Sequence, residues 1–394
     1  MSQYKIFLDD YLERINTEGR YRTFVDIERD CASPPYAFCK DTNSKVVLWC
    51  SNDYLGMGMH PKVTSAAIKA LETCGIGAGG TRNISGNSSA VVELEQVLAR
   101  LHNKQKALVF SSGYVANQNS LFALAKIFQD LVFFSDADNH ASIIAGINYS
   151  RAKKYIFAHN DIDSLRECLK QEDITKPKVI VFESIYSMDG SLAPLTDICS
   201  LARQYNALTY LDEVHSVALY GASGAGMAEE LGLSQQIDII QGTLGKGFGG
   251  VGGYLAAAIE VIEAIRLTAP GFIFTTAMPP LIAAGLKASI EYLMNSNDER
   301  IKHQANVATF KSHLRAAKIN FFDGGTHIIP IMIGDAKRAK LISESLLHQH
   351  QIYLQHINYP TVPKGAERLR VIITPHHTQE MMQDLIKALK GLGL

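Results

Sequence analysis

Short apolar runs alternate with helical stretches over much of this 394-residue sequence, and this alternation constrains the fold most strongly. The apolar runs contain almost no polar interruptions, and they are KALVF, LVFFS, KYIF, KVIVF, ALTYL and IDII. The stretches between them that have helical periodicity include YVANQNSLFALAKI, DIDSLRECLK and LTDICSLARQY. Strands without alternation are buried on both faces, so the sequence predicts an α/β fold whose mostly parallel sheet is covered by helices.

Three segments are expected along the chain. Residues 1–45 form an N-terminal arm, in which residues 2–16 have the spacing of an amphipathic helix and an irregular stretch rich in Pro, Cys and Asn follows. Residues 46–285 form a large domain that contains the sheet. Residues 286–394 mix helices with strands such as HIIPIMIG, which predicts a small C-terminal α+β domain.

Composition excludes several classes of function. The formal net charge is −1, so no field favours nucleic acid or an anionic membrane. The six cysteines form no CxxC pair and no metal-ligand spacing with histidine, which is typical of reduced thiols in the cytoplasm. We therefore expect a cytoplasmic protein without a metal, a nucleic-acid partner or a membrane span.

Two glycine patterns imitate the dinucleotide fingerprint G-x-G-x-x-G, one in CGIGAGG and one in GKGFGG. A true fingerprint follows a strand and opens a helix. The first pattern follows an expected helix that begins at Pro61, and the second runs into another expected strand, GGYLAAA. Neither pattern therefore predicts nicotinamide or flavin binding.

Lys246 and Asp212 each follow or end a buried strand. Lys246 lies between glycines in GTLGKGFGG, and a partly desolvated lysine can form a Schiff base. Asp212 ends the run ALTYLD, where a buried carboxylate needs a cation such as a pyridinium nitrogen. Taken alone, Lys246 is also compatible with a surface lysine and Asp212 with a turn residue.

Other candidate ligands lie at further strand ends. His140 and His215 are placed to stack on a cofactor ring and to contact its phenolic oxygen, although isolated histidines are more often structural. Gly113 in SSGYVAN opens a helix whose first amides can hold a phosphate, and Thr243 is a second phosphate donor. Together with Lys246 and Asp212, this order predicts a pyridoxal-phosphate (PLP) enzyme that binds its cofactor at the carboxyl edge of the sheet.

These residues and the blocks around them resemble the α-oxoamine synthases, and among these the 5-aminolevulinate synthases. The blocks include WCSNDYLGMG, GAGGTRNISG, FESIYSMDG, LDEVH, GTLGKGFG and GFIFTT, and the resemblance extends from residue 19 to residue 370. It implies a PLP-dependent transferase of fold type I, aminotransferase-like, with a seven-stranded sheet in the large domain. It also implies a homodimer whose active sites lie at the subunit interface.

The resemblance assigns roles to individual residues. Lys246 matches the lysine that binds the cofactor covalently, Asp212 the partner of the pyridine nitrogen, His140 the stacking residue and His215 the phenolate contact. The remaining positions that match cofactor ligands are Ser112, Gly113, Tyr114, Ser187, Thr243, Thr275 and Thr276, with Thr275 serving the opposite subunit. Arg370 matches the arginine that binds the glycine carboxylate.

The acyl donor is predicted from a second group of residues. Arg22, Thr81 and Asn83 match positions that hold the distal carboxylate of succinyl-CoA, and an acetyl or long fatty acyl chain offers no charge for Arg22. An alternative for Arg22 is a local ion pair with Asp26 or Glu28. The further positions that match substrate contacts are Asn52, Ile84 and Ser135, and NYPTVPKG (358–365) resembles a lid over the active site.

The implied reaction condenses glycine with succinyl-CoA and releases CoA and CO2 to give 5-aminolevulinate, for tetrapyrrole, including haem, or secondary-metabolite synthesis. Lys246 handles both proton steps. Another acyl-CoA, as in 2-amino-3-ketobutyrate CoA ligase, or a non-catalytic subunit of the same fold are the alternatives.

This sequence departs from the family at four positions. Val91 stands at a usual histidine, Ser216 and Ala218 change the usual HAVGLYG, and Gly247 replaces a common alanine.

Overall fold

The computed structural model describes residues 2–394, which form two compact units. Of the described residues, unit 1 contains 2–51, 188–191 and 302–394, and unit 2 contains 52–187 and 192–301. The units differ from the three expected segments in two respects. The N-terminal segment shares a unit with the C-terminal one, and helix α11 (Pro280–Asn295), which the expected boundary at 285 divides, packs within unit 2 on α2 and α3.

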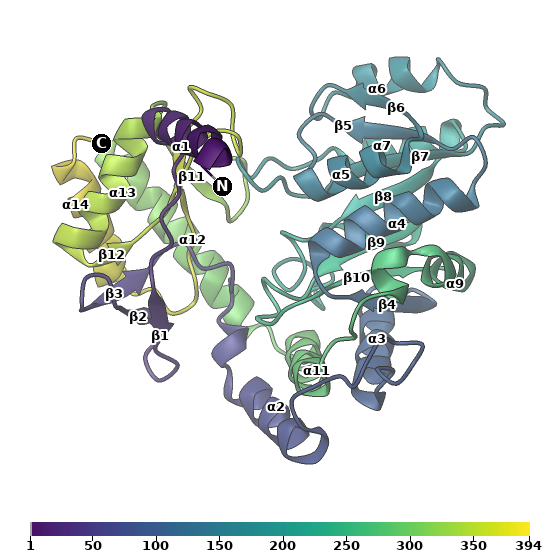
Figure 1. The fold of residues 1–394 in the computed structure, drawn as a ribbon, viewed down its shortest axis with the longest axis horizontal. Coiled ribbons are helices and arrows are strands. Elements are labelled where there is room, and N and C mark those ends of the chain that lie inside the picture. The colour runs from purple at the N-terminus through teal and green to yellow at the C-terminus, as the bar shows by residue number, and fades with distance from the viewer. Residues whose placement is uncertain (1) are drawn as a thin grey trace. The chain divides into compact units, whose positions relative to one another are not determined.

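Unit 2 is built on a seven-stranded sheet (Figure 1). Its strands, in chain order, are β4 (Lys106–Phe110), β5 (Val132–Asp136), β6 (Lys153–Phe157), β7 (Lys178–Glu183), β8 (Leu208–Asp212), β9 (Ile239–Thr243) and β10 (Gly253–Ala257). Their spatial order is β4-β10-β9-β8-β7-β5-β6, and β10 alone runs antiparallel to its neighbours. The predicted α/β fold with a mostly parallel seven-stranded sheet is confirmed.

Helices cover the sheet of unit 2. They are α2 (Pro61–Cys74), α3 (Ser89–Leu101), α4 (Gly113–Ile127), α5 (Ala141–Ser150), α6 (Ile162–Leu169), α7 (Leu195–Gln204), α8 (Met227–Glu230), α9 (Ile259–Thr268), α10 (Pro270–Ile273) and α11. One cluster of buried residues joins α4, α5 and α9 to alternate residues of the strands, whereas α6 and α7 pack on β5, β6 and β8. The intervening strand residues are also buried, which explains the unalternated runs.

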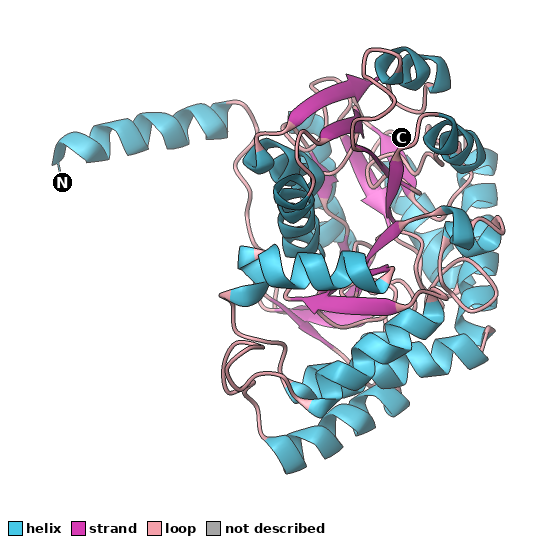
Figure 2. Cartoon of the chain, turned by 90° about the vertical axis from the view of Figure 1, so that its right-hand side faces the viewer, coloured by secondary structure: helices cyan, strands magenta, loops and turns pink. Residues whose placement is uncertain are grey.

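Unit 1 contains two smaller sheets. One has the order β1-β2-β3-β12 and the other β11-β14-β13. The elements of this unit are α1 (Ser2–Thr17), β1 (Ile27–Arg29), β2 (Tyr36–Cys39), β3 (Ser44–Leu48), α12 (Asp298–Ala317, from residue 302 on), β11 (Ile329–Met332), α13 (Ala336–His350), β12 (Ile352–Tyr353), β13 (His356–Ile357), β14 (Arg368–Val371) and α14 (Gln379–Gly391). Figure 2 shows α1 at the N-terminal end of the chain.

The expectation of an irregular stretch up to about residue 45 is wrong. Strands β1, β2 and β3 form an antiparallel meander, in which Ala37, Cys39 and Val46 are buried. These strands are only three to five residues long, so the Pro, Cys and Asn residues of the connecting turns dominate the local composition. A short strand of this kind gains its stability from its neighbours in the sheet rather than from its own sequence.

No helix described between residues 2 and 394 combines the length and the apolar character needed to cross a membrane. Over the same residues, the His, Cys, Asp and Glu side chains form no group of three or more that could hold a metal ion.

Candidate active site

The candidate residues of unit 2 gather at the carboxyl ends of parallel strands. Glu183 on β7, Asp212 on β8 and Gln241 on β9 are neighbours in register. The segments that follow β4, β5, β8 and β9 carry Gly113, His140, His215 and Lys246. Because parallel strands share one carboxyl edge, the fold brings these residues to a common face.

Asp212 is a buried carboxylate that is held by uncharged donors. Its Oδ2 accepts a hydrogen bond from Asn117 Nδ2 at 2.8 Å, and its Oδ1 accepts one from the Val214 amide at 2.8 Å. Burial raises the pKa of Asp212, whereas the hydrogen bond from Asn117 lowers it. Within residues 2–394, no Lys, Arg or His nitrogen forms a salt bridge with Asp212, so a cationic group of a ligand would offset its desolvation.

His215 lies between a tyrosine and the candidate lysine. Its Nδ1 is 2.8 Å from the hydroxyl oxygen of Tyr54, and its Nε2 is 2.8 Å from Lys246 Nζ. Tyr54 and His215 are buried and Lys246 is partly buried. The ring therefore joins Lys246 to a buried hydroxyl through two short hydrogen bonds and fixes the position of the Lys246 amine.

His140 precedes helix α5 and is fixed on two sides. Its backbone amide donates to Glu183 Oε1 at 2.6 Å, and its Nδ1 lies 2.8 Å from Ser142 Oγ. Burial lowers the pKa of His140, which favours the neutral ring that stacking on a cofactor requires. The ring of Tyr114 meets the His140 ring edge-on, with 6.4 Å between the centroids.

The N-terminus of α4 forms the candidate phosphate cradle. Ser112 caps this helix by accepting a hydrogen bond from the Val115 amide at 3.1 Å. A Cβ atom at Gly113 would lie 3.4 Å from Gln241 Nε2 and 3.5 Å from Thr243 Oγ1. Glycine therefore keeps the approach to the first amides of the 15-residue helix open, and those amides favour an anion.

The geometry of unit 2 fits pyridoxal phosphate. The fit rests on the buried Asp212 without an ion pair, on the glycine-lined helix N-terminus and on the lysine amine beside His215. In addition, Gln241 Oε1 is buried and has no hydrogen-bond partner in the part of the chain that the structure describes. These groups supply the anion-binding amides, the carboxylate and the amine that the cofactor's phosphate, pyridine nitrogen and aldehyde need.

The loop that carries Thr81, Asn83 and Ile84 lies beside the segment of Thr275 and Thr276. Thr81 and Thr276 form an isolated β-bridge, and the Ala277 amide donates to the Gly80 carbonyl at 3.0 Å. Asn83 and Ile84 are exposed, and Thr81 Oγ1 donates to Asn83 Oδ1 at 2.8 Å. The structure therefore joins a predicted acyl-binding loop to a predicted phosphate-binding segment.

Three other predicted site residues, Ser135, Asn52 and Ser187, make no hydrogen bond that joins them to Asp212, His215 or Lys246 among the contacts described above. Ser135 is buried on β5, and its Oγ accepts a hydrogen bond from Asn139 Nδ2 at 2.9 Å. Asn52 is exposed, and Ser187 is half-buried at the end of the segment that follows β7. The predicted contacts of these three side chains with ligands stay predictions.

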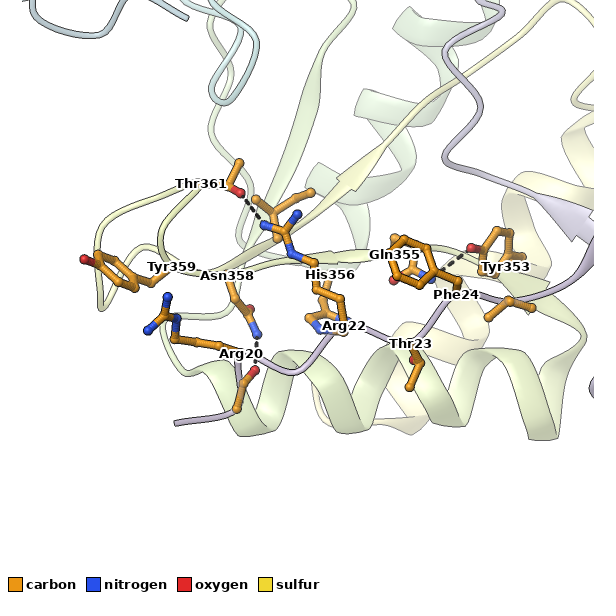
Figure 3. A pocket seen from close by; sticks show the side chains of 13 residues that line it. Arg20, Arg22, Thr23, Phe24, Tyr353, Gln355, His356, Asn358, Tyr359 and Thr361 are labelled. Atoms are coloured by element: carbon orange, nitrogen blue, oxygen red, sulfur yellow. Dashed lines mark hydrogen bonds between the residues drawn. The ribbon is translucent and has the colours of Figure 1, made fainter. Parts of the chain in front are cut away.

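Two predicted substrate residues, Arg22 and Arg370, lie in unit 1. Arg370 is half-buried on β14, opposite Pro330 of β11. Arg22 lines a pocket between the N-terminal linker and the segment 353–361 (Figure 3), and its Nη2 donates to Thr361 Oγ1 at 2.9 Å. Among the described residues Arg22 makes no ion pair, and Asp26 pairs with Lys40 at 3.4 Å, so the alternative of a local ion pair of Arg22 is wrong.

Several site residues escaped the sequence reasoning. Asn117 follows Gly113 by four residues, so helical periodicity puts it on the same face of α4 and could have found it. Glu183 ends a buried strand, as Asp212 does, so the same rule could have found it. Burial, and to a lesser extent the charge of Asp212, raises the pKa of Glu183 well above the usual range. Tyr54 lies in an irregular loop after β3, where no periodicity marks it.

The departures at Ala218 and Gly247 lie next to each other in the structure. A Cβ atom at Gly247 would lie 2.6 Å from the Ala218 Cβ and 2.7 Å from the Val217 carbonyl oxygen. The Ala218 methyl group, on a residue with φ of 72°, therefore fills the space beside the lysine loop that a methyl group at 247 would need. Ser216 Oγ adds hydrogen bonds to the Glu213 carbonyl at 2.9 Å and to Ser184 Oγ at 3.0 Å.

Val91 lies in the first turn of α3 and is completely buried. It lines a small cavity together with Thr275 and Thr276. An apolar side chain here removes the hydrogen-bonding capacity that a histidine would bring to this cavity.

Comparison with known proteins identifies the family. The family model for class I and II aminotransferases matches residues 44–389. The 5-aminolevulinate synthase of Rickettsia conorii is 53% identical over 389 residues, which cover 99% of this chain and 94% of that protein. The chain belongs to the 5-aminolevulinate synthase family. The enzyme of that name from Bradyrhizobium diazoefficiens is 48% identical over 388 residues, covering 98% and 95%.

Solved structures agree with this placement. A high-resolution structure of SPT with PLP superposes with a TM-score of 0.91 at 29% identity, and covers 100% of this chain and 98% of that chain. The 8-amino-7-oxononanoate synthase of Francisella tularensis has a TM-score of 0.73 at 25% identity, over 88% and 96% of the two chains. The predicted resemblance to the α-oxoamine synthases, and the PLP-dependent transferase fold, are confirmed.

Proposed function

We propose that this protein is a 5-aminolevulinate synthase, which condenses glycine with succinyl-CoA and releases 5-aminolevulinate, CoA and CO2 with pyridoxal phosphate as cofactor. The observation that carries the proposal is the 53% identity to a 5-aminolevulinate synthase over nearly the full length of both chains. The retained strand-end residues Lys246, Asp212, His140 and His215 support it, because a non-catalytic relative has no need of them.

When bound, pyridoxal phosphate supplies an electron sink that stabilises negative charge at the glycine α-carbon. Asp212 would hold the pyridine nitrogen in its protonated form, and the hydrogen bond from Asn117 favours the ionised carboxylate. His140 would cover the face of the ring. The amides that follow Ser112, together with Thr243, hold the phosphate at the N-terminus of α4.

Lys246 anchors the cofactor and moves protons. The Lys246 Nζ would hold the cofactor, and as a free amine it would accept the α-proton of glycine and return a proton to the product. The 2.8 Å contact with His215 Nε2 keeps this amine oriented, and the 2.8 Å contact of His215 with Tyr54 fixes the ring itself. Tyr54 therefore positions His215, and His215 positions the Lys246 amine that acts as the base.

Substrate recognition is assigned to separate residues. Arg370 binds the glycine carboxylate through its planar fork of donors. Arg22, whose Nη2 donates to Thr361 Oγ1 at 2.9 Å, is assigned to the distal carboxylate of the acyl group. Thr81, Asn83 and Ile84 are assigned to further contacts with the acyl-CoA. Asn52, Ser135 and Ser187 are assigned to the surroundings of the bound substrate and cofactor.

A homodimer in the cytoplasm completes the proposal. Ile76, Ile84 and Phe274 of unit 2 are 78–80% exposed, and large apolar side chains with this exposure are typical of a surface that a partner covers. In the proposed dimer, Thr275 would serve the phosphate site of the opposite subunit. Sedimentation analysis of the purified protein should give twice the mass of 43.3 kDa, and a monomer would contradict this part.

The proposal is tested by spectroscopy and product formation together. Purified protein with pyridoxal phosphate should absorb in the visible range, and borohydride should bleach this band and leave the reduced cofactor on the peptide that contains Lys246. The same preparation should form 5-aminolevulinate only when both glycine and succinyl-CoA are present. A protein that takes up no cofactor, or that forms no product, would refute the proposal.

A further inference from the structure

In unit 1 the linker after helix α1 is tied to the loop 358–365 at three points (Figure 3). Asn358 Nδ2 donates to the Gly19 carbonyl at 3.1 Å, and Arg22 Nη2 donates to Thr361 Oγ1 at 2.9 Å. Between these two contacts, the guanidinium carbon of Arg20 lies 5.0 Å from the centroid of the Tyr359 ring. Of the residues that form these three contacts, Arg22 and Thr361 are assigned to acyl binding, whereas the contact of Arg20 with Tyr359 has no assigned role.

Arg20 is held from both ends. Its backbone amide donates to the Ile15 carbonyl at 2.9 Å, which fixes the residue to the last turn of α1. Its Nη1 donates to Glu18 Oε2 at 2.8 Å, and its side chain is only 25% exposed. These two contacts hold the side chain where its guanidinium carbon lies over the Tyr359 ring.

The ring of Tyr359 has a second cation near it, since Lys364 Nζ lies 5.6 Å from the same centroid. The ion pair of Glu18 with Arg20 joins near neighbours in sequence, so it forms whatever the position of the loop 358–365. The contact of Arg20 with Tyr359 joins residues 339 positions apart and exists only while the loop lies against the linker. Of the two contacts of the Arg20 guanidinium, the one with the Tyr359 ring is therefore the one that depends on the position of the loop.

We propose that Arg20 is a positioning residue, which holds Tyr359 and with it the loop 358–365 so that Thr361 stays beside Arg22. The inference rests on the proposed function, because it makes Arg20 a determinant of acyl-CoA binding although Arg20 itself does not touch the acyl group. Loss of Arg20 leaves Arg22 and Thr361 present and frees the loop that brings them together.

The first test uses a protease and needs no substrate. Lys364 is exposed within the loop, so a lysine-specific protease cleaves after it when the loop opens, and cleavage after Lys45 in the same unit serves as internal reference. Arg20→Met and Tyr359→Leu should each speed cleavage at Lys364 about fivefold, and Tyr359→Phe, which keeps the ring, should not. Unchanged cleavage in Arg20→Met would overturn the proposal.

Arg315 offers a matched control variant. It also pairs with one carboxylate, Asp323, and lies 5.6 Å from one aromatic ring, Phe321, within unit 1, but it does not line the pocket. Arg315→Met should leave the cleavage rate at Lys364 and the kinetic constants unchanged. Equal acceleration in Arg315→Met and Arg20→Met would mean general loosening of the unit and would also overturn the proposal.

The second test is kinetic. Arg20→Met should raise KM for succinyl-CoA about fivefold and change KM for glycine less than twofold, and the double variant with Tyr359→Leu should be no worse than either single one. Additive effects, or an equal rise of both KM values, would overturn the proposal. A wild-type protein without synthase activity refutes the proposed function, whereas the protease result still decides whether Arg20 holds the loop.

Discussion

The contact between the positions of Gly247 and Ala218 yields a prediction whose size follows from the structure. In Gly247→Ala the new methyl carbon would lie 2.6 Å from the Ala218 Cβ and 2.7 Å from a backbone oxygen, both far inside van der Waals contact. Overpacking of this kind costs about 1–3 kcal/mol and moves backbone. Because residue 247 directly follows Lys246, we expect both a less stable protein and a lower kcat.

The reverse change tests the same contact. Ala218→Gly loses one buried methyl group, about 0.8 kcal/mol, and relieves a left-handed backbone that costs alanine about 1 kcal/mol, so alone it should be nearly neutral. The double variant should recover only part of the stability and activity that Gly247→Ala loses, because Ala218→Gly removes the 2.6 Å clash but leaves the new methyl carbon 2.7 Å from the Val217 carbonyl oxygen. The assay is urea unfolding of the cofactor-free protein, followed by circular dichroism, together with kcat. Additive effects in the double variant, or a harmless Gly247→Ala, would refute the reasoning.

Three further predictions concern the site. Lys246→Ala should bind the cofactor without a borohydride-reducible bond and show essentially no turnover, as absorbance and product assays will measure. Arg22→Met should raise KM for succinyl-CoA about 30- to 160-fold, since it removes a charge-assisted pair of about 2–3 kcal/mol, and should leave KM for glycine unchanged. Asn117→Ala should raise the pKa of Asp212 further, because it removes a hydrogen bond to the ionised carboxylate. In urea unfolding the variant should lose about 1.5–3 kcal/mol of stability at pH values above the pKa that Asp212 has in the folded protein. This loss should shrink as the pH falls through that pKa, because the carboxylate is then protonated in both proteins. Tyr210→Phe removes the 2.8 Å hydrogen bonds of the Tyr210 hydroxyl to Asn117 Oδ1 and Ser120 Oγ but leaves the Asn117 donor on Asp212, so its cost should not follow the titration of Asp212.

The large sheet and its strand-end residues were predictable for one physical reason. A buried strand such as ALTYLD tolerates a carboxylate only at its end, and in a parallel sheet all such ends meet at one edge. The sequence therefore carries both the sheet and the grouping of Asp212, His215 and Lys246. Glu183, which also ends a buried strand, lies at the same edge although it was not among the predicted site residues.

Other features depend on contacts that no local pattern records. The meander of β1, β2 and β3 consists of strands of three to five residues whose stability comes from pairing. Tyr54 reaches His215 across 161 positions of sequence, and Arg20 reaches Tyr359 across 339. The exchange of a methyl group between positions 218 and 247 is visible only once the two backbones are placed in space.

A panel of substrates tests directly whether the protein condenses glycine with succinyl-CoA. Purified protein loaded with pyridoxal phosphate is given glycine with succinyl-, acetyl- or palmitoyl-CoA, and L-serine with palmitoyl-CoA, and the release of CoA is followed for each pair. We expect the highest kcat/KM for glycine with succinyl-CoA and the formation of 5-aminolevulinate. Faster turnover with acetyl-CoA, or with serine and palmitoyl-CoA, would contradict it.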